Sequence, residues 1–572
     1  MKQVYNLVDL LLTQVRTQPD APFLHRKIDG IYQSLSFNEV YENTLFAAVG
    51  LQVNGLQEGD QVAMLSHNRP EWVIGDLATQ SIRGVNVPIY PTLSPEDIGY
   101  ILKDSESKAV IVENSSYAEK VMKVVSKCPK LDLIIIIDQD DIGWRPTEGI
   151  RIKTLDEIVE DGINTDVEIK EALQNLMKAL RPADLASIVY TSGTTGNPKG
   201  VALTHGNFVA NVTDIMETWK IDETDRLLSF LPLSHVFERT AGYYVPMAFG
   251  AQIYYAESID TVAADMLLVQ PTILISVPRL YEKIRTKILE NLSGVKKRLF
   301  GWALRIGRRV YIQNRDEKIR IMDRIRLSWA KRLVFSKVIK KTGGSIRYFV
   351  SGGAPLSKEV NEFFEGMGFS VVEGYGMTET SPVIASNPPW DRRGGSVGIP
   401  LPSVKVKLAK DGELLVKGPS VMSGYYKKPG KTKDAFDKDG WLRTGDIAKI
   451  DSDGYIQIVD RKKELIVLSN GKKVPPLPIE ELIKGSRYVN QIILVGDKHN
   501  YISALIVPEI EALSKQFPHL DSPEDKALNA PDIRAFIKKV IASKCGQLSR
   551  HEKIKTFYLL AKPFSEEAGE LT

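Results

Sequence analysis

Short apolar runs alternate with amphipathic stretches along most of the chain. The runs that have the pattern of strands are residues 62–66, 109–113, 132–137, 186–190, 346–350 and 369–373. Between such runs apolar residues recur at helical spacing, as in the set Val360, Phe363, Phe364 and Met367. Strands that alternate with helices predict helices layered on sheets. We therefore expect an α/β fold.

The pattern changes at about residue 404. The sequences VKVKLAKDGELLVKG and GYIQIVD alternate with a period of two and contain tight turns, which predicts a small barrel-like or open antiparallel sheet. A Gly- and Pro-rich turn at 470–478 follows, and the next helix is expected to begin at Ile479. With 572 residues the chain exceeds one compact core. We expect a large domain over 1–460, with 404–460 as its β subdomain, and a small mobile α+β domain over 461–572.

Composition is that of an ordinary globular protein, with 43% hydrophobic and 26% charged residues. The two cysteines, Cys128 and Cys545, show no metal-binding spacing and favour a reducing compartment. Asp9 interrupts the apolar start, which argues against a signal peptide. No apolar run reaches the ~18 residues of a membrane span. The expected location is the cytoplasm.

Positive charge is concentrated in one segment. Residues 279–347 contain 21 Lys and Arg against 5 Asp and Glu. The segment is interpreted either as a solvated helical face or as a surface for anionic lipid or a phosphorylated ligand. Apolar residues interleaved with the charges suit an interfacial amphipathic helix; they are Trp302, Leu304, Tyr311, Ile319 and Trp329. No nucleic-acid recognition motif accompanies them, so peripheral contact with an anionic membrane is the sharper hypothesis.

The stretch YTSGTTGNPKG, residues 190–200, lies between two strand-like runs. It is not a Walker loop, because Lys199 is followed by Gly200 instead of Ser or Thr. It can still hold phosphate, since Gly193 and Gly196 let backbone N–H groups converge on an anion. Hydroxyl groups come from Thr191, Ser192, Thr194 and Thr195. The alternative is an ordinary polar hairpin tip.

This stretch resembles the phosphate-binding loop of the adenylate-forming superfamily, which includes acyl-CoA synthetases, peptide-synthetase adenylation domains and luciferases. Further motifs follow in the order of that family: LPLSHVFER (231–239), SGGAPL (351–356), VEGYGMTETS (372–381), GWLRTGDIA (440–448) and DRKKELI (460–466). LPLSHVFERT and the basic stretch before SGGAPL resemble long-chain fatty-acid–CoA ligases most. The resemblance implies a reaction in two steps. A carboxylate attacks the α-phosphorus of ATP to give acyl-AMP and pyrophosphate, and the thiol of coenzyme A then displaces AMP.

The resemblance also implies roles for individual residues. Residues 190–200, with Lys199, hold the β- and γ-phosphates, and Thr191 and Glu379 are ligands of Mg²⁺. Thr378 approaches the α-phosphate. The adenine site is lined by Gly352, Gly353, Ala354, Glu373, Gly374, Tyr375 and Gly376, with Tyr375 stacking on the ring.

Residues nearer the chain end are assigned in the same way. Asp446 accepts hydrogen bonds from the ribose hydroxyls, for which a carboxylate offers two acceptor oxygens. Arg461 is a second ribose or phosphate contact, and Asp460 is the hinge of the small domain. Gly471 and Lys472 line the path of the thiol, although the following VPPLPIE departs from the common form of that motif.

His235, in LPLSHVF, is placed by the resemblance near the acyl carboxylate, and the alternative is a core histidine. It is not expected to be a general base, because a fatty carboxylate is already ionised at neutral pH. Phe237, Tyr243 and Tyr244 are candidate lining of the acyl pocket. Arg239 stands where some bacterial relatives carry an aromatic gate.

The sequence thus predicts a long-chain acyl-CoA synthetase that uses ATP, Mg²⁺ and coenzyme A. An acyl–acyl-carrier-protein synthetase and an acyl-adenylate binder without turnover remain as alternatives. The partners are a fatty acid, ATP and coenzyme A, with a membrane surface and a second copy of the chain as further candidates. The end, KPFSEEAGELT, lacks the family's terminal PTxKxxR-type motif. We therefore expect a truncated chain or an unusual end, with slow acyl-AMP formation.

Overall fold

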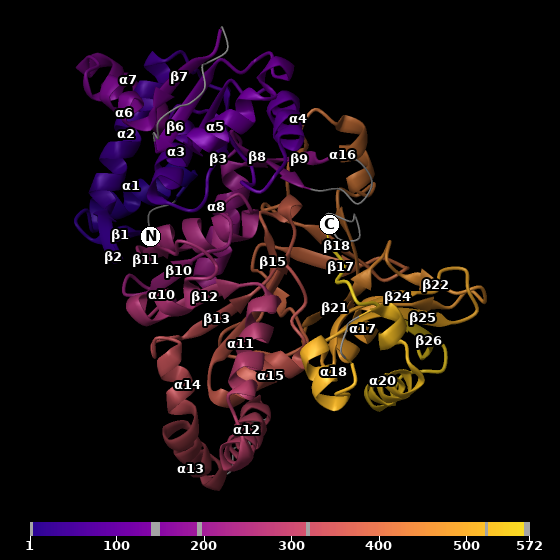
Figure 1. Cartoon of the computed structure of the whole chain (residues 1–572). Helices are drawn as coiled ribbons and strands as arrows, with labels where there is room; N and C mark the ends of the chain where they lie inside the picture. The colour runs from indigo at the N-terminus through magenta and orange to yellow at the C-terminus, as the bar shows by residue number, and fades with distance from the viewer. Residues whose placement is uncertain (1–3, 139–148, 192–196, 316–320, 521–523, 566–572) are drawn as a thin grey trace.

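The computed structural model describes residues 4–138, 149–191, 197–315, 321–520 and 524–565. Helices and strands alternate through the first two thirds of the chain, as the apolar pattern predicts, and they build two large sheets in the described residues (Figure 1). One hydrophobic cluster connects these sheets, and it contains Trp72, Phe208 and Tyr243. The α/β class expected from the sequence is confirmed.

The first large sheet has the order β19-β9-β8-β4-β3-β5-β6-β7. Its strands are β3 (Gln61–Leu65), β4 (Val85–Pro88), β5 (Ala109–Asn114), β6 (Leu133–Asp138), β7 (Arg151–Thr154), β8 (Leu185–Thr191), β9 (Lys199–Thr204) and β19 (Gly424–Tyr425). Strands β3 to β8 run parallel, and β9 and β19 are antiparallel additions at one edge. Helices that accompany it are α2 (Phe37–Val53), α3 (Pro70–Ser81), α4 (Pro95–Ser105), α5 (Ser115–Met122), α6 (Leu155–Ile163) and α7 (Val167–Lys178).

The second large sheet has the order β16-β15-β14-β13-β12-β10-β11-β1-β2. Its strands are β1 (Pro22–Ile28), β2 (Ile31–Ser36), β10 (Arg226–Ser229), β11 (Gln252–Tyr255), β12 (Ile273–Ser276), β13 (Tyr348–Ser351), β14 (Ser370–Gly376), β15 (Val383–Ser386) and β16 (Ile399–Pro400). Its helices are α1 (Leu7–Thr17), α8 (His205–Thr218), η2 (Glu238–Tyr244), α9 (Val245–Phe249), α10 (Val262–Val269) and α15 (Lys358–Met367). The central strands are parallel, so the loops after β10, β12 and β13 emerge at one edge.

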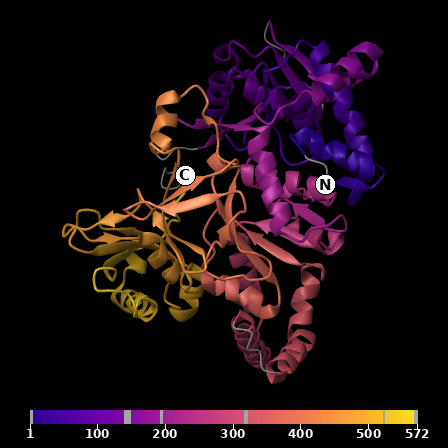
Figure 2. The same cartoon turned by 180° about the vertical axis from the view of Figure 1, so that it is seen from behind.

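The basic segment is helical, as expected. It forms α11 (Pro278–Glu290), α12 (Gly294–Arg315), α13 (Ile321–Ala330), η3 (Lys331–Phe335) and α14 (Ser336–Lys341). Both views show α12 and α13 projecting from the body of the molecule as a hairpin (Figures 1 and 2). No helix in the described ranges has both the length and the apolar character needed to span a bilayer.

The segment 404–460 is an open sheet and not a barrel. Its order is β17-β18-β20-β21, formed by β17 (Lys405–Leu408), β18 (Glu413–Lys417), β20 (Leu442–Ile450) and β21 (Ile456–Arg461). Among the described residues the edge strands β17 and β21 do not pair with each other. Four short strands are too few to close around side chains, so the barrel-like alternative is wrong and the open-sheet alternative is confirmed.

The last part of the chain has a hydrophobic cluster of its own. Its elements are β22 (Ile466–Val467), β23 (Lys473–Val474), α17 (Pro476–Lys484), β24 (Val489–Val495), β25 (Ile502–Pro508), α18 (Ile510–Gln516), α19 (Asp525–Leu528), α20 (Pro531–Lys544) and β26 (Ile554–Leu559). Helix α17 begins at Pro476, three residues before the expected start at Ile479. Proline favours the first helical turn because its missing N–H has no partner there in any case.

Candidate functional site

The predicted adenine-lining residues lie on two adjacent strands. β13 and β14 are parallel, and Ser351 is in register with Glu373. Gly352, Gly353 and Ala354 follow β13, and Glu373 to Gly376 form the end of β14. The first half of the motif VEGYGMTETS, up to Gly376, belongs to strand β14, with which β15 pairs in the antiparallel direction.

Two of these glycines are required by close packing. A Cβ atom on Gly352 would lie 2.7 Å from the Phe237 ring, and one on Gly376 would lie 1.8 Å from the Pro382 carbonyl oxygen. Any larger side chain would therefore displace neighbouring atoms at both positions. The close packing of Phe237 and Pro382 therefore explains why glycine stands at these two positions.

The carboxyl group of Glu373 is turned toward helix α15. The Asn361 amide donates a hydrogen bond of 2.8 Å to Glu373 Oε1, and the Glu373 residue is 5% exposed. Burial raises the pKa of Glu373 to about 8, so the carboxyl group is mostly protonated at neutral pH. Its side chain is engaged in holding α15 against β14.

The residues predicted for adenine and ribose meet directly. The Tyr375 hydroxyl donates a hydrogen bond to Asp446 Oδ2, and Arg461 Nε lies 3.7 Å from Asp446 Oδ1. Asp446 and Arg461 face each other on the paired strands β20 and β21. Burial raises the pKa of Asp446, while the Tyr375 hydrogen bond opposes that rise. Three residues far apart in the sequence therefore form one polar cluster.

The phosphate loop is described only at its ends. Ser192, Gly193, Thr194, Thr195 and Gly196 lie outside the described residues. Thr191 ends β8 and is paired with Lys199, the first residue of β9, so the prediction of a loop between two strands is confirmed.

Lys199 and Glu379 lie on either side of a residue that the sequence analysis missed. Lys199 Nζ is 4.8 Å from the centroid of the Tyr425 ring. The Tyr425 hydroxyl donates a hydrogen bond of 2.8 Å to Glu379 Oε1. Tyr425 stands in the stretch GYYKKPGKT, whose short β19 strand gave no alternation strong enough to mark it.

The donor set at this point fits Mg²⁺. Glu379 is 8% exposed in the short helix η4 (Thr378–Thr380), and it offers carboxylate oxygens, while Thr191 offers a hydroxyl. Mg²⁺ prefers oxygen ligands and usually keeps several waters, so one carboxylate and one hydroxyl are enough. Among the described residues no group of three or more Asp, Glu, His or Cys gathers to form a larger metal cage.

His235 is accessible at the turn before η2. Its Nδ1 accepts a hydrogen bond of 3.1 Å from the Phe237 N–H, and its ring centroid lies 6.4 Å from that of Tyr90. Partial desolvation by the surrounding chain lowers the pKa of His235. The neutral ring then carries its proton on Nε2, which is left to donate to a ligand.

An apolar cavity of about 40 Å³ begins beside these residues. One wall is formed by Phe237, Ala241 and Val245, and Gly374 of β14 lies at its border. The remaining lining residues are Ile215, Trp219, Ile221, Leu227, Ile273, Ile275, Val350, Val383 and Ser386. The cavity therefore connects the sheet that carries Tyr375 with the segment that carries His235.

Comparisons with known proteins identify the family of the chain. Residues 11–426 match the family described as AMP-binding enzyme. The chain belongs to this family. Residues 463–564 match the family described as AMP-binding enzyme C-terminal domain.

Curated relatives support the same family. The long-chain-fatty-acid–CoA ligase FadD15 of Mycobacterium bovis is 33% identical, over 99% of this chain and 93% of its own length. Mouse long-chain-fatty-acid–CoA ligase 6 is 33% identical over 96% of this chain and 80% of its own. The crystal structure of ATP-bound MatB from Rhodopseudomonas palustris matches with a TM-score of 0.72 at 23% identity, over 99% of this chain and 98% of that one.

In this AMP-binding enzyme Tyr243 and Tyr244 do not line the cavity. Both are fully buried, and Tyr244 belongs to a network around Arg239. The Arg239 guanidinium donates hydrogen bonds of 2.8 Å to the Tyr244 hydroxyl and 2.7 Å to Ser187 Oγ. It also forms an ion pair with Asp76. The expectation that the two tyrosines line the acyl pocket was wrong. Two adjacent aromatic residues in a helix do not reveal from sequence which side of the helix faces a cavity and which side packs against a buried polar network.

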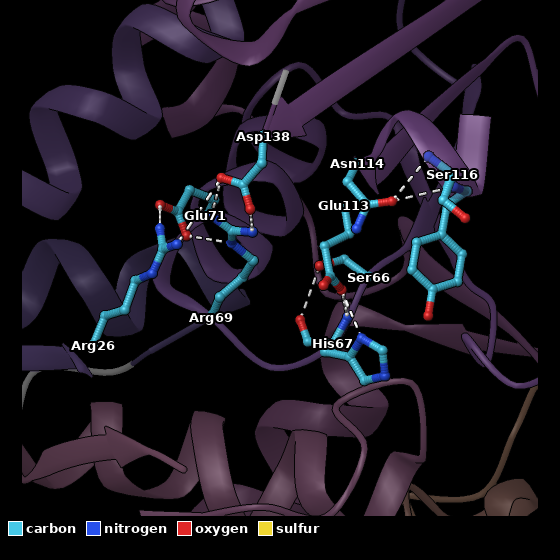
Figure 3. Close-up of polar contacts among 10 residues, drawn as sticks. Arg26, Ser66, His67, Arg69, Glu71, Glu113, Asn114, Ser116 and Asp138 are labelled. Atoms are coloured by element: carbon cyan, nitrogen blue, oxygen red, sulfur yellow. Dashed lines mark hydrogen bonds and ion pairs between the residues drawn. The ribbon is translucent and has the colours of Figure 1, made fainter. Parts of the chain in front are cut away.

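The carboxyl ends of β3, β5 and β6 carry polar clusters that sequence reasoning did not single out (Figure 3). In one, Arg69 contacts Glu71 at 2.8 Å and also Asp138; in the other, His67 contacts Glu113 at 2.7 Å. The side-chain amide of the adjacent Asn68 donates a hydrogen bond of 2.6 Å to the Leu231 carbonyl and accepts one of 2.9 Å from the Leu233 N–H. This segment, SHNRPEW, therefore fixes the stretch that leads to His235.

Gly471 and Lys472 are exposed at the tip of the β22–β23 hairpin. Among the described residues, the hydrogen bonds of this hairpin go to its own residues and to the neighbouring residues 497–500, and none goes to Tyr375, Asp446 or Arg461. Asp460 lies near the end of β21. Its carboxylate accepts a hydrogen bond of 2.7 Å from the Arg461 N–H and one of 3.0 Å from the Leu477 N–H. It joins the open sheet to α17 of this AMP-binding enzyme.

Proposed function

We propose that the protein is a long-chain fatty-acid–CoA ligase that forms acyl-AMP from a fatty acid and ATP and transfers the acyl group to coenzyme A. The observation that supports this best is the position of the apolar cavity. It borders Gly374, one residue before Tyr375, so an acyl chain in the cavity would present its carboxylate beside the cluster that suits a nucleotide. Names of full-length relatives point to the same substrate class.

The nucleotide would be held by residues of both large sheets and of the open sheet. Tyr375 and Asp446 suit adenine and ribose, and Arg461 adds a positive charge beside them. Lys199 and the adjoining loop suit the β- and γ-phosphates, with Thr378 near the α-phosphate. Thr191 and Glu379 would hold Mg²⁺, which supplies neutralisation of the phosphate charge.

The acyl carboxylate would meet His235. The hydrogen bond from Phe237 N–H to His235 Nδ1 places the ring proton on Nε2, so this atom can donate to a carboxylate oxygen. Orientation of two anions, not proton removal, is the demand of the first step. Gly471 and Lys472 would line the path of coenzyme A only after the small domain, proposed as residues 461–572, turns about Asp460.

Pyrophosphate release tests the proposal. Wild-type protein is incubated with a long-chain fatty acid, ATP and Mg²⁺, with coenzyme A, with acyl carrier protein, or with neither. We expect release that depends on the fatty acid, and acyl-CoA as the product. Absence of fatty-acid-dependent release would overturn the ligase assignment, and product only with carrier protein would change the acceptor.

We further propose that the basic helices 279–347 contact an anionic membrane surface. On α12 the exposed residues Arg298, Trp302, Arg305, Arg309 and Ile312 follow helical spacing along one face. Beyond it Ile321 is 79% exposed, Trp329 60% and Leu333 62%. Apolar side chains among cations on a projecting hairpin suit a lipid interface. Leu304 and Tyr311 are partly buried instead, and Ile319 lies outside the described residues.

A further inference from the structure

Tyr425 stands between two groups of opposite charge. Its hydroxyl contacts Glu379 Oε1 at 2.8 Å, and its ring face lies 4.8 Å from Lys199 Nζ. Among the described side chains no ion pair joins Lys199 directly to Glu379. The neutral Tyr425 side chain therefore donates a hydrogen bond to a carboxylate through its hydroxyl and makes a cation–π contact with an ammonium group through its ring.

The backbone around Tyr425 is hydrogen-bonded to the short helix η4, which carries Glu379, and to strand β9, which carries Lys199. The Met422 N–H donates 2.8 Å to the Glu379 carbonyl, and the Tyr426 N–H donates 2.8 Å to the Gly200 carbonyl. Tyr425 is also in register with Val201 across β19 and β9, and its own N–H donates 2.9 Å to Thr432 Oγ1. The ring is therefore held by the main chain and does not depend on a ligand for its position.

This arrangement has a consequence for the two charges. A carboxylate and an ammonium group that collapse into a direct pair neutralise each other, and neither is then available to a ligand. The Tyr425 hydroxyl contacts Oε1 of Glu379, and among the described residues no hydrogen bond or ion pair involves Oε2, which could face a cation. A ring face attracts an ammonium group only weakly, so a triphosphate can draw Lys199 away.

We propose that Tyr425 is a positioning residue that keeps Glu379 aimed at a divalent cation and keeps Lys199 apart from it. The proposal rests on the function proposed above and adds a residue to it.

Two substitutions separate the two contacts. Tyr425→Phe removes the hydroxyl and keeps the ring, whereas Tyr425→Leu removes both. Tyr426→Phe is the matched control, since its hydroxyl lies toward Gln61 at 3.5 Å and not toward the site. Glu379→Ala serves as the reference for loss of the predicted ligand itself. Each variant is checked by thermal denaturation.

Two measurements are made on the full chain. The first is pyrophosphate release against Mg²⁺ concentration, and the second is calorimetric titration with ATP in the presence and absence of Mg²⁺. For Tyr425→Phe we expect the Mg²⁺ concentration for half-maximal rate to rise about tenfold, the effect of one lost hydrogen bond to a charged group. The KM for ATP at saturating Mg²⁺ should stay within about twofold. Tyr425→Leu should also raise that KM, and Tyr426→Phe should change neither.

The outcomes decide the proposal. An unchanged Mg²⁺ requirement in Tyr425→Phe overturns it, and so does a fall in thermal stability with equal loss of ATP affinity with and without Mg²⁺, because that marks a purely structural residue. If the wild type releases no pyrophosphate, the proposed function fails. The calorimetric comparison of ATP with and without Mg²⁺ still tests Tyr425 in that case.

Discussion

At the scale of single residues, buried carboxyl groups surround the candidate site. Glu238 is 2% exposed, and the Ser229 hydroxyl donates 2.7 Å to its Oε1. Burial raises the pKa of Glu238 to about 8, as it does for Glu373. These side chains are therefore mostly neutral at pH 7 and act as hydrogen-bonding groups, Glu238 with Ser229 of β10 and Glu373 with Asn361 of α15.

Glu238→Gln should alter how stability depends on pH. Since the native pKa of about 8 exceeds the reference value of 4.5, the native state holds a proton that the unfolded chain releases between these values. The stability contributed by Glu238 is therefore full below about pH 4.5 and falls by up to about 1.4 kcal/mol per unit as pH rises through 8. Glutamine cannot ionise, so the stability of the variant relative to the wild type should increase from pH 5 to pH 9.

Thermal denaturation across that range measures the effect. The exposed Glu223→Gln is the matched control and should show no gain that grows with pH. Parallel curves for Glu238→Gln and the wild type would contradict the assignment of a neutral Glu238. Glu373 contributes the same slope to both proteins and does not affect their difference.

At the scale of elements, apolar periodicity predicted where strands and helices lie but not all of their partners. The runs at 109–113 and 132–137 became β5 and β6 almost residue for residue, because parallel central strands are apolar throughout. Tyr375, Asp446 and Arg461 could be named only through motifs, and their direct contact is visible only in the fold. Tyr425 was missed because β19 is two residues long and its role depends on pairing with β9.

Helix η2 forms a wall of the cavity, which leads to a prediction about acyl chain length. Ala241→Phe should fill the cavity of about 40 Å³ and lower kcat/KM for long acyl chains by about tenfold or more. Shorter chains that end before Ala241 should be affected less, and the KM for ATP should not change. Ala264→Phe, on the exposed face of α10, is the control. A uniform loss for every chain length would contradict this position for the acyl pocket.

The projecting helices lead to a prediction about lipid binding. Reversal to Glu at four exposed cations should weaken binding to vesicles with anionic lipid, at ~1 kcal/mol for each engaged residue. These residues are Arg298, Arg305, Lys340 and Lys341. Sedimentation with vesicles at low and high salt measures binding, which should fall steeply with salt.

A matched set of four reversals elsewhere provides the control. It comprises Lys410, Lys431, Lys438 and Lys498, all exposed and outside the basic helices. Equal loss in both sets would indicate a general charge effect, and binding that ignores salt would leave the solvated-face interpretation. Neutral vesicles should bind neither the wild type nor the variants.

At the scale of the whole molecule, the open sheet and the last hydrophobic cluster meet at Asp460. Its carboxylate accepts hydrogen bonds from the N–H groups of Arg461 and Leu477. At a separate contact, Lys544 of α20 lies 3.9 Å from Glu359 of α15. In this arrangement no hydrogen bond or ion pair among the described residues joins Gly471 or Lys472 to Tyr375 or Asp446. The roles proposed for both groups therefore call for a second orientation of the small domain, proposed above as residues 461–572.

Asp460→Pro should separate the two half-reactions. Proline fixes φ near about −65° and removes a backbone N–H, so rotation at this residue is restricted. Pyrophosphate release without coenzyme A, and acyl-CoA formation from supplied acyl-AMP, are measured separately. We expect the ratio of the two rates to change by about tenfold or more, with one step nearly preserved. Asp460→Ala keeps the backbone free and should change the ratio little; equal loss of both steps in Asp460→Pro would argue against a hinge here.

The ion pair of Arg239 and Asp76 bears on how such a pocket can be redesigned. Both side chains are fully buried, and they join η2 to α3 and, through Ser187, to β8. Removal of one member of a buried pair typically costs about 3–5 kcal/mol, whereas exchange of the whole set for apolar residues can be neutral. If η2 is replaced by the corresponding segment of a relative, the residues at positions 76, 239 and 244 would thus have to be exchanged together. A single substitution of Arg239 would destabilise the fold, so its effect on substrate preference could not be measured.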